Sequence, residues 1–258
     1  MTGHAPTHAA VDLSGQTALV TGASAGLGWR FARVLAAAGA KVAIAGRRTE
    51  KLTELSALIA DEGGTAFAVP MDMTDAGAIV SGVDAAEEAL GPVTILVNNA
   101  GIPDAQRATR MSVELIDAVI ATNLRGPFIL ACEIARRLID RKQQGRIVNI
   151  SSAAAFHYAG EGAALYATTK GAVARMTEAL AVEWARFGIN VNAIAPGSFQ
   201  SEMMAGMIGR MGDFADQLPR KRICDPALLD STLLYLCAPA SEAVTGTVIR
   251  VDDGQLPR

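Results

Sequence analysis

Short apolar runs rich in β-branched residues alternate with segments of helical period along almost the whole chain. The runs are predicted to be strands at 17–21, 41–46, 65–70, 94–99, 146–151, 189–196 and 247–252. Helices are predicted between them at 27–38, 50–61, 76–90, 113–140, 165–187 and 226–236. Near-continuously apolar strands, each followed by a helix, are typical of a parallel sheet covered on both faces. We therefore expect a single-domain, Rossmann-like doubly wound α/β fold.

The chain contains no repeat, low-complexity stretch or composition change that would mark a domain boundary. We expect one domain over 13–258, preceded by a flexible tail at 1–12. A (β/α)₈ barrel is the alternative at 258 residues. The glycine-rich turn after the first predicted strand favours the doubly wound fold over the barrel.

Charge and hydropathy argue against several classes of partner. The net charge is -3 and the pI is about 5.7, so nothing favours nucleic acid or an anionic membrane surface. No apolar run reaches the roughly 20 residues that a membrane span needs. The first twelve residues lack the basic and apolar regions of a secretory signal. The sequence predicts a protein of the cytoplasm that binds neither nucleic acid nor membrane.

The cysteines and histidines give no sign of a disulfide framework or a metal site. The three cysteines are widely spaced without a CxxC motif, so buried reduced thiols in a reducing compartment are expected. The three histidines share no metal-ligand spacing, and two of them lie in the tail, so no metal is expected. These residues are Cys132, Cys224, Cys237, His4, His8 and His157.

The segment LVTGASAGLG joins the first predicted strand to the first predicted helix. Its glycines, Gly22, Gly26 and Gly28, allow a tight turn and let backbone N–H groups approach a pyrophosphate at the helix N-terminus. A turn that only packs the strand against the helix is the alternative. A P-loop does not fit, because no Lys-Ser/Thr pair follows the last glycine.

The end of the second predicted strand indicates which nucleotide binds. Dinucleotide sites for NAD carry an acidic residue about 20 positions after the turn, whereas arginine accommodates the 2′-phosphate of NADP. Here Gly46 takes the acidic position and Arg47 and Arg48 follow it. We expect NADP(H) to be preferred, with NAD(H) possible and with Arg47 as the main phosphate partner. A solvated arginine pair is the alternative, and Ala25 adds no second basic group.

The segment LYATTKGAV places Tyr166 and Lys170 four residues apart, on one face of a predicted helix. Such a pair alone is compatible with an exposed helical surface. Together with a cofactor turn it is also compatible with an acid–base device.

Several motifs in a fixed order resemble the short-chain dehydrogenase/reductase family of about 250 residues, over residues 12–254. The resemblance rests on the cofactor turn, on a segment after the fourth strand, on four catalytic positions and on two stretches near the C-terminus. These are TGASAGLG, NNAG (98–101), Asn123, Ser152, Tyr166, Lys170, PGSFQS (196–201) and VDDG (251–254), the last with Asp253 in place of a glycine.

The resemblance implies a catalytic tetrad of Asn123, Ser152, Tyr166 and Lys170. It also implies a homodimer or homotetramer joined through the predicted helices at 113–140 and 165–187, and a substrate lid at about 198–222. The full cofactor set that we expect is Gly22, Ser24, Ala25, Gly26, Leu27, Gly28, Arg47, Arg48, Asp72, Met73, Asn99, Ala100, Gly101, Tyr166, Lys170, Pro196 and Gly197. In this family Thr21 and Ile194 are further cofactor neighbours.

Moving a hydride to a carbonyl also requires a proton donor that works near neutral pH. Tyrosine has a pKa of about 10, and a neighbouring ammonium or an oxidised nicotinamide favours the phenolate and lowers the pKa. We expect Lys170 to lower the Tyr166 pKa, Ser152 to hold the substrate oxygen, and Asn123 to anchor a water that connects Lys170 to solvent.

The substrate side is expected to involve the loop before Tyr166 and the lid. Fourteen positions separate Ser152 from Tyr166, one more than in many relatives, so Ser151 is a second candidate hydroxyl. The lid is rich in methionine, which builds adaptable apolar surfaces, although a packed helical stripe is the alternative. The expected substrate residues are Ser152, His157, Tyr158, Phe199, Met203, Met204 and Met207.

These residues predict an NADP(H)-dependent oxidoreductase that reduces a hydrophobic ketone to a secondary alcohol, reversibly. A 3-oxoacyl thioester reductase is the alternative enzyme. A non-catalytic nucleotide-sensing or scaffold protein is the alternative of another class, and fold alone does not separate the three.

Overall fold

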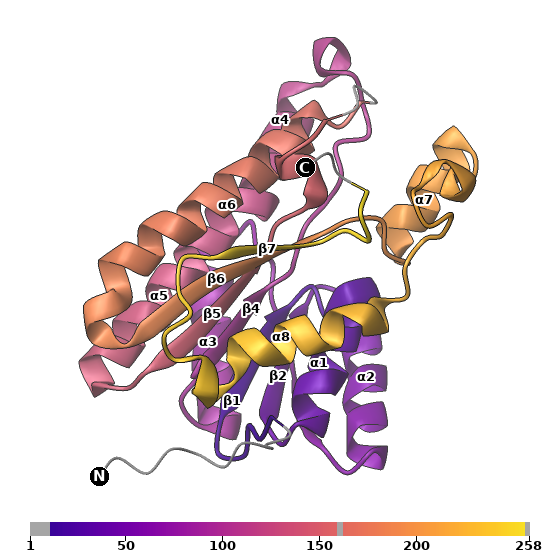
Figure 1. Cartoon of the computed structure of the whole chain (residues 1–258). Coiled ribbons are helices and arrows are strands. Elements are labelled where there is room, and N and C mark those ends of the chain that lie inside the picture. The colour runs from indigo at the N-terminus through magenta and orange to yellow at the C-terminus, as the bar shows by residue number, and fades with distance from the viewer. Residues whose placement is uncertain (1–10, 159–161, 256–258) are drawn as a thin grey trace.

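The computed structural model describes residues 11–158 and 162–255, and within them seven strands pair into one parallel sheet. The order across the sheet is β3-β2-β1-β4-β5-β6-β7 (Figure 1). The strands are β1 (Thr17–Thr21), β2 (Lys41–Gly46), β3 (Thr65–Pro70), β4 (Ile95–Asn98), β5 (Gly145–Ile150), β6 (Ile189–Pro196) and β7 (Val248–Val251). Each predicted strand is present, within one residue at either end.

Burial follows the sequence pattern of each strand. Every residue of β1, β4, β5 and β6 is buried, because these central strands have helices on both faces. The edge strand β3 instead alternates, with Thr65 and Phe67 exposed and Val69 buried. Strands are therefore buried along their whole length in the part of the sheet that is covered on both sides.

Eight α-helices connect and cover the strands in the described part of the chain. They are α1 (Gly26–Ala37), α2 (Thr49–Asp61), α3 (Ala76–Leu90), α4 (Val113–Ile120), α5 (Gly126–Arg141), α6 (Ala164–Trp184), α7 (Glu202–Met211) and α8 (Asp230–Cys237). Local signals fix their ends: Asp75 caps α3 through the amides of Gly77 and Ala78, and Gly91 ends it at φ 92°.

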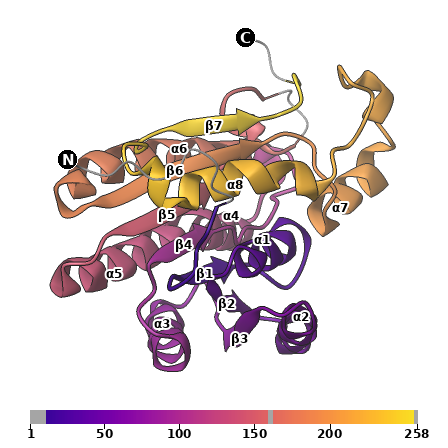
Figure 2. The ribbon, with the colours of Figure 1, turned by 60° about the horizontal axis from the view of Figure 1, so that its bottom comes forward.

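Two hydrophobic clusters fill the two sides of the sheet. Apolar residues of α1, α2 and α8 form one cluster, and those of α3, α5 and α6 form the other. Figure 2 shows these layers on opposite sides of the sheet. The doubly wound α/β fold is confirmed. Its strand order reverses between β1 and β4, which is where such folds bind nucleotides at the carboxyl ends of the strands.

The helix predicted at 113–140 consists of α4 and α5 with a π-helical turn at Ala121–Arg125 between them. Together the three segments form one continuous helical rod from Val113 to Arg141. By length and composition this rod could cross a membrane, but core helices of globular proteins have the same length and composition. Leu130, Ile134 and Leu138 on α5 are almost fully buried in the cluster beside α3 and α6. The rod is therefore a core helix on that face.

The helix predicted at 226–236 begins as a 3₁₀ turn at Pro226–Leu229 before α8. Asp225 accepts a hydrogen bond from the amide of Ala227 at 2.8 Å and caps this turn. The predicted helix at 165–187 likewise ends in a 3₁₀ turn at Ala185–Phe187.

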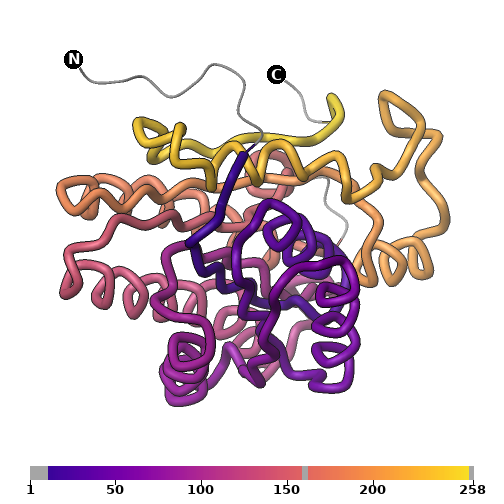
Figure 3. Tube along the Cα trace, turned by 90° about the horizontal axis from the view of Figure 1, so that it is seen from below, coloured from indigo at the N-terminus to yellow at the C-terminus, as the bar shows by residue number. Residues whose placement is uncertain are grey.

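The segment that the sequence identified as a lid contains a regular helix, α7, in which no residue is buried. Figures 1 and 3 show it, in orange, extending from the body of the molecule beyond the carboxyl ends of the strands. Residues 1–10 of the tail expected at 1–12 lie outside the described residues. Val11 packs against the core and Leu13 is fully buried, so the folded domain includes Val11.

Candidate active site

A cavity of about 990 Å³ runs along the carboxyl ends of the strands, from the turn after β1 to the inner face of α7. It brings together almost all of the residues that the sequence assigned to cofactor and substrate. Gly28, Asn123 and Ile194 do not line it. Gly28 and Asn123 instead lie against residues that do, as their contacts show.

Each glycine of the first turn has its own steric reason. Gly22 and Gly26 have φ values of 64° and 56°, which disfavour any residue with a Cβ. A Cβ at Gly28 would lie 2.4 Å from the carbonyl oxygen of Gly22, so this glycine allows α1 to start directly against the turn. The turn is thereby held tight, with the N-terminus of α1 facing the cavity.

The loop after β4 is joined to β1 by two side chains. The hydroxyl of Thr21 accepts hydrogen bonds from the amides of Asn99 and Ala100 at 3.0 and 3.1 Å. The side-chain amide of Asn99 donates to the carbonyl of Thr21 at 2.9 Å. Thr21 and Asn99 therefore set the spacing between two loops that line the cavity.

The end of the cavity beside β2 is basic. Arg47 is exposed and lines it, and Arg48 donates to the hydroxyl of Ser24 at 3.1 Å and pairs with Glu202 on α7. Asp72 lies nearby and accepts from the amide and hydroxyl of Thr74. These hydrogen bonds, with a smaller contribution from the charge of Arg47, lower the pKa of the Asp72 carboxyl.

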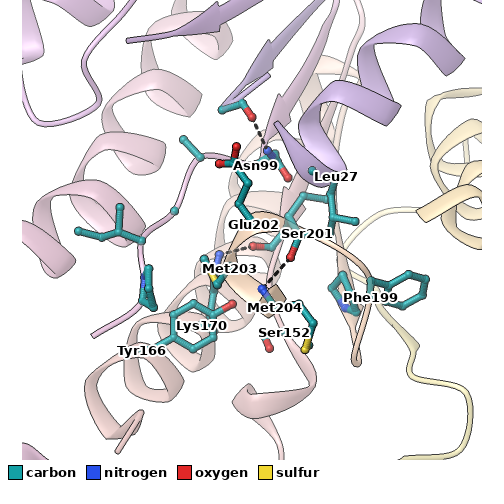
Figure 4. A pocket seen from close by; sticks show the side chains of 18 of the residues that line it. Leu27, Asn99, Ser152, Tyr166, Lys170, Phe199, Ser201, Glu202, Met203 and Met204 are labelled. Atoms are coloured by element: carbon teal, nitrogen blue, oxygen red, sulfur yellow. Dashed lines mark hydrogen bonds between the residues drawn. The ribbon is translucent and has the colours of Figure 1, made fainter. Parts of the chain in front are cut away.

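Tyr166, Lys170 and Ser152 lie together in the middle of the cavity (Figure 4). The ammonium of Lys170 lies 5.7 Å from the centre of the Tyr166 ring and donates to the carbonyl of Ile150 at 2.7 Å. Tyr166 also hydrogen-bonds the hydroxyl of Ser152. The spacing of four residues does place both side chains of α6 at one site.

Burial dominates the electrostatics of this group. It raises the pKa of Tyr166, against the hydrogen bond to Ser152, which lowers it, and the charge of Asp104 raises it further. Burial also lowers the pKa of the Lys170 ammonium to about 8. The sequence predicts that Lys170 lowers the Tyr166 pKa, but in the protein without coenzyme this pKa is raised instead. The reason is that burial removes the water that would stabilise the phenolate.

Asn123 lies in the π-helical turn and is 1% exposed. Its side-chain oxygen accepts from the amide of Ile102 at 2.8 Å, and its side-chain nitrogen donates to the carbonyl of Ile102 at 2.9 Å. Both ends of the amide thus hold the loop after β4. A Cβ at Gly101 in this loop would lie 3.5 Å from the Lys170 nitrogen, so the loop stands directly beside the ammonium.

Asp104 is a site residue that the sequence argument missed. Its carboxylate is 3% exposed and accepts hydrogen bonds from the amides of Leu165 and Tyr166 at 2.9 and 3.0 Å. The residue before α6, Ala163, offers no side-chain cap, so Asp104 caps this helix from a distant loop. No local capping motif precedes Tyr166, and the sequence therefore carried no signal for this contact.

The predicted substrate residues fall into two groups. His157 is exposed at the cavity, and the Tyr158 oxygen accepts from the amides of Gly162 and Ala163, which occupies its polar end. Met203, Met204 and Met207 line the cavity from α7. Phe199 also borders the cavity, but its ring is buried in the core and points away from Tyr166 in Figure 4.

The second candidate hydroxyl, Ser151, is buried and donates to the carbonyl of Lys170 at 2.8 Å. Ser152 is the one that hydrogen-bonds Tyr166, so the extra loop residue does not move the hydroxyl away from the phenol. The cysteine thiols are free, with Cys224 and Cys237 buried and Cys132 half-buried.

Asp253, where relatives carry glycine, adopts φ 54° and ties the end of the lid segment to the last strand. Its carboxylate forms a bidentate ion pair with Arg222 at 2.8 and 3.0 Å, and Arg220 lies 3.1 Å away. The left-handed conformation explains why glycine is common at this position. The two arginines give a reason for an aspartate here.

Comparison with known proteins supports what the geometry indicates. The family model described as short chain dehydrogenase matches residues 16–209. Gluconate 5-dehydrogenase of Gluconobacter oxydans is 38% identical over 247 residues, with 94% of this chain and 95% of that protein covered. The 3-oxoacyl-acyl-carrier-protein reductase of Aquifex aeolicus is 33% identical over 246 residues, covering 95% and 98%.

A crystal structure of gluconate 5-dehydrogenase from Burkholderia cenocepacia, in complex with NADP and tartrate, superimposes with a TM-score of 0.88 at 34% identity, covering 95% of this chain and 96% of that one. Further similar structures hold NADP or NADPH. The glycine-rich turn, the Ser152, Tyr166 and Lys170 group and these relatives agree. The chain belongs to the short-chain dehydrogenase/reductase family and is an oxidoreductase that acts on the CH–OH/C=O pair.

Proposed function

We propose that this enzyme reduces a hydrophobic ketone to a secondary alcohol, reversibly, with NADP(H) as its coenzyme. The observation that carries the proposal is the position of Tyr166, which lines the cavity together with Ser152 and Lys170 and interacts with both side chains. A phenol in this setting is a proton donor placed beside a second hydrogen-bond donor for the same substrate oxygen.

The residues of the cavity fit a dinucleotide. Gly22 and Gly26 leave room for a pyrophosphate at the N-terminus of α1, and Asp72 and Asn99 line the part assigned to the adenosine. When bound, NADPH supplies the hydride that reduces the carbonyl carbon. The remaining steps of the reaction belong to side chains of this chain.

Tyr166 donates its phenolic proton to the carbonyl oxygen as negative charge develops there, and Ser152 donates a hydrogen bond to the same oxygen. The phenolate that remains is stabilised by the Lys170 ammonium. Asn123 keeps the loop at Ile102 against this group through its two side-chain hydrogen bonds. We also propose that a water molecule near Asn123 links the Lys170 ammonium to solvent.

Two observations support NADP(H) over NAD(H). Gly46 replaces the acidic residue that would repel a 2′-phosphate, and Arg47 and Arg48 both line the cavity at that end. Similar solved proteins hold NADP or NADPH. Because Arg47 is exposed and lines the cavity at this end, whereas Arg48 is paired with Glu202, we assign Arg47 the main contact with the phosphate.

The walls around Tyr166 support an apolar substrate. Met203, Met204 and Met207 of the lid line the same cavity as Ile102 and Ala153, and thioether side chains adapt to varied apolar shapes. Arg210 also lines the cavity, and relatives are named for gluconate, so a keto acid is the second candidate. A 3-oxoacyl thioester is the third candidate substrate, because one relative is named a 3-oxoacyl-acyl-carrier-protein reductase.

A carbonyl panel measured with NADPH and with NADH tests this proposal. The panel contains aryl and alkyl ketones, 5-ketogluconate and a 3-oxoacyl thioester, each at several concentrations. The proposal expects the highest kcat/KM with an apolar ketone and NADPH. A higher kcat/KM with ketogluconate or with the thioester would replace the substrate class. Coenzyme binding without turnover on any carbonyl would favour a nucleotide-sensing or scaffold protein.

We further propose a cytoplasmic homodimer or homotetramer joined through the α4–α5 rod and α6. In support, Phe128 and Ile120 on the rod are 46% and 38% exposed, and they line an apolar hollow of about 480 Å³ together with Met176 of α6. An exposed apolar patch of this kind on two long helices is typical of an interface between protein chains.

A further inference from the structure

The guanidinium of Arg48 joins two segments that line the cavity. Its Nε donates to the hydroxyl of Ser24 at 3.1 Å, and its two terminal nitrogens each donate to one oxygen of Glu202 at 3.0 Å. Glu202 is the first residue of α7 and lies 154 positions away in the chain. The bidentate pair therefore joins the turn after β2 to the start of the lid.

The start of the lid also touches the glycine-rich turn. A Cβ at Gly26 would lie 3.2 Å from the Cβ of Ser201, and Ser201 caps α7 through the amide of Met204 at 3.1 Å. The other end of the lid segment is held by the ion pair between Arg222 and Asp253. No residue of α7 itself is buried. Backbone hydrogen bonds of Cys224 with Ser198 and Gln200, both at 2.9 Å, also join the two ends of the lid segment, so the ion pair of Glu202 adds to contacts that already hold the lid.

We propose that Glu202 competes with the 2′-phosphate of the coenzyme for Arg48, and that it thereby determines coenzyme selectivity and couples it to the start of the lid. This inference rests on the NADP(H) part of the proposed function. Glu202 lines the same end of the cavity as Ser24, Arg47 and Arg48, where the phosphate is expected. A phosphate dianion that reaches Arg48 meets the carboxylate at close range, and like charges there repel.

The pair is weak enough for this exchange. The side chains of Arg48 and Glu202 are 43% and 65% exposed, and ion pairs at that exposure contribute little stability. A 2′-phosphate offers Arg48 a stronger bidentate partner of higher charge. NAD(H) has only a hydroxyl at this position, so it leaves the pair to Glu202 intact. The lid start is consequently released by NADP(H) and not by NAD(H).

Calorimetric titration of the full chain with two fragments of the coenzyme isolates the effect. Adenosine 2′,5′-bisphosphate carries the 2′-phosphate, and AMP lacks it. For Glu202→Gln we expect the Kd of the bisphosphate to fall about threefold to fivefold, the range of an exposed ion pair, while the Kd of AMP is unchanged. The control Glu62→Gln removes another exposed carboxylate paired with an arginine, Arg33, and is expected to change neither value.

Suppose that the wild type prefers the bisphosphate and that Glu202→Gln leaves the ratio of the two Kd values unchanged. This result would overturn the role of Glu202 and leave the coenzyme assignment standing. A wild-type enzyme that binds both fragments equally would instead overturn the assignment of NADP(H). Hydrogen exchange at 204–208 tests the lid: saturating NADP⁺ is expected to speed exchange relative to saturating NAD⁺, and equal rates would overturn the coupling.

Discussion

The carboxylate of Asp104 accepts a hydrogen bond from the backbone amide of Tyr166 at 3.0 Å, although the two residues are 62 positions apart in the chain. The contact caps the helix that carries the proposed proton donor and places a buried negative charge near its phenol. Burial first, and then this charge, raise the pKa of Tyr166 against the hydrogen bond to Ser152. Asp104 in the loop after β4 thus contributes both to the position of the helix and to the pKa of Tyr166.

Asp104→Asn is expected to shift the pH profile of ketone reduction. The asparagine oxygen can still accept from the helix amides, but the charge that raises the Tyr166 pKa is lost. Reduction needs the protonated phenol, so kcat falls as pH rises through the Tyr166 pKa, and in the variant this fall begins at a lower pH. The control Asp61→Asn changes an exposed carboxylate on α2. An alkaline limb at the same pH in Asp104→Asn and wild type would refute the electrostatic part of the contact.

Lys170→Met is expected to stabilise the protein at pH 7 while it removes activity. Burial lowers the Lys170 pKa from 10.5 to about 8 in the folded state, so a charged, 4% exposed ammonium costs on the order of 3 kcal/mol below pH 8. The lost hydrogen bond to Ile150 offsets about 1 kcal/mol of this gain. Chemical denaturation at pH 7 measures the difference in the free energy of unfolding.

The same pair of proteins gives a second readout. Because the folded-state pKa lies below the unfolded value, the unfolded chain binds more protons between about pH 8 and 10.5, and Lys170 makes wild-type stability rise with pH in that window. The advantage of Lys170→Met should therefore shrink toward pH 10.5. A variant that is less stable than wild type at pH 7 would contradict the cost assigned to the buried charge.

Arg47→Asp is expected to reverse the coenzyme preference. The substitution removes a charge-assisted contact with the 2′-phosphate and adds a repulsive carboxylate one residue after the position at which NAD sites of this fold carry an acidic residue. We expect the NADPH/NADH ratio of kcat/KM to fall by about tenfold or more. A ratio equal to that of the wild type would show that Arg47 does not contact the phosphate.

Phe128→Glu is expected to dissociate the proposed oligomer. Phe128 is 46% exposed on the α4–α5 rod, and a carboxylate at the centre of an apolar interface between chains is destabilising. Sedimentation velocity should give a smaller species than wild type. Phe67→Glu, which changes an exposed ring on the edge strand β3, serves as the control. An unchanged sedimentation coefficient in Phe128→Glu would place the interface elsewhere.

Much of the fold was predictable because each element carries its own local pattern. The strands β1 to β7 are short apolar runs in the sequence. The turn requires positive φ values at Gly22 and Gly26, and glycine at these positions indicates such a turn. The spacing of Tyr166 and Lys170 on one helix fixes their shared face without any tertiary information. These features depend on neighbours in the sequence.

Contacts between distant segments were not predictable. Asp104 caps α6 from another loop, and Glu202 meets Arg48 only because the fold brings the start of α7 beside the turn after β2. The π-helical turn that seats Asn123 leaves no mark on the helical period of that segment. The Tyr166 pKa also required the structure, because it depends on how much water the surrounding side chains exclude.

The central claim is that Tyr166 donates the proton that accompanies hydride transfer. Single-turnover reduction by Tyr166→Phe, with NADPH fluorescence titration on the same sample, tests it most directly. We expect the rate to fall by at least about 100-fold while the Kd of NADPH stays within about twofold, because the ring remains and only the phenolic oxygen is lost. A rate close to that of the wild type in Tyr166→Phe would contradict the assignment.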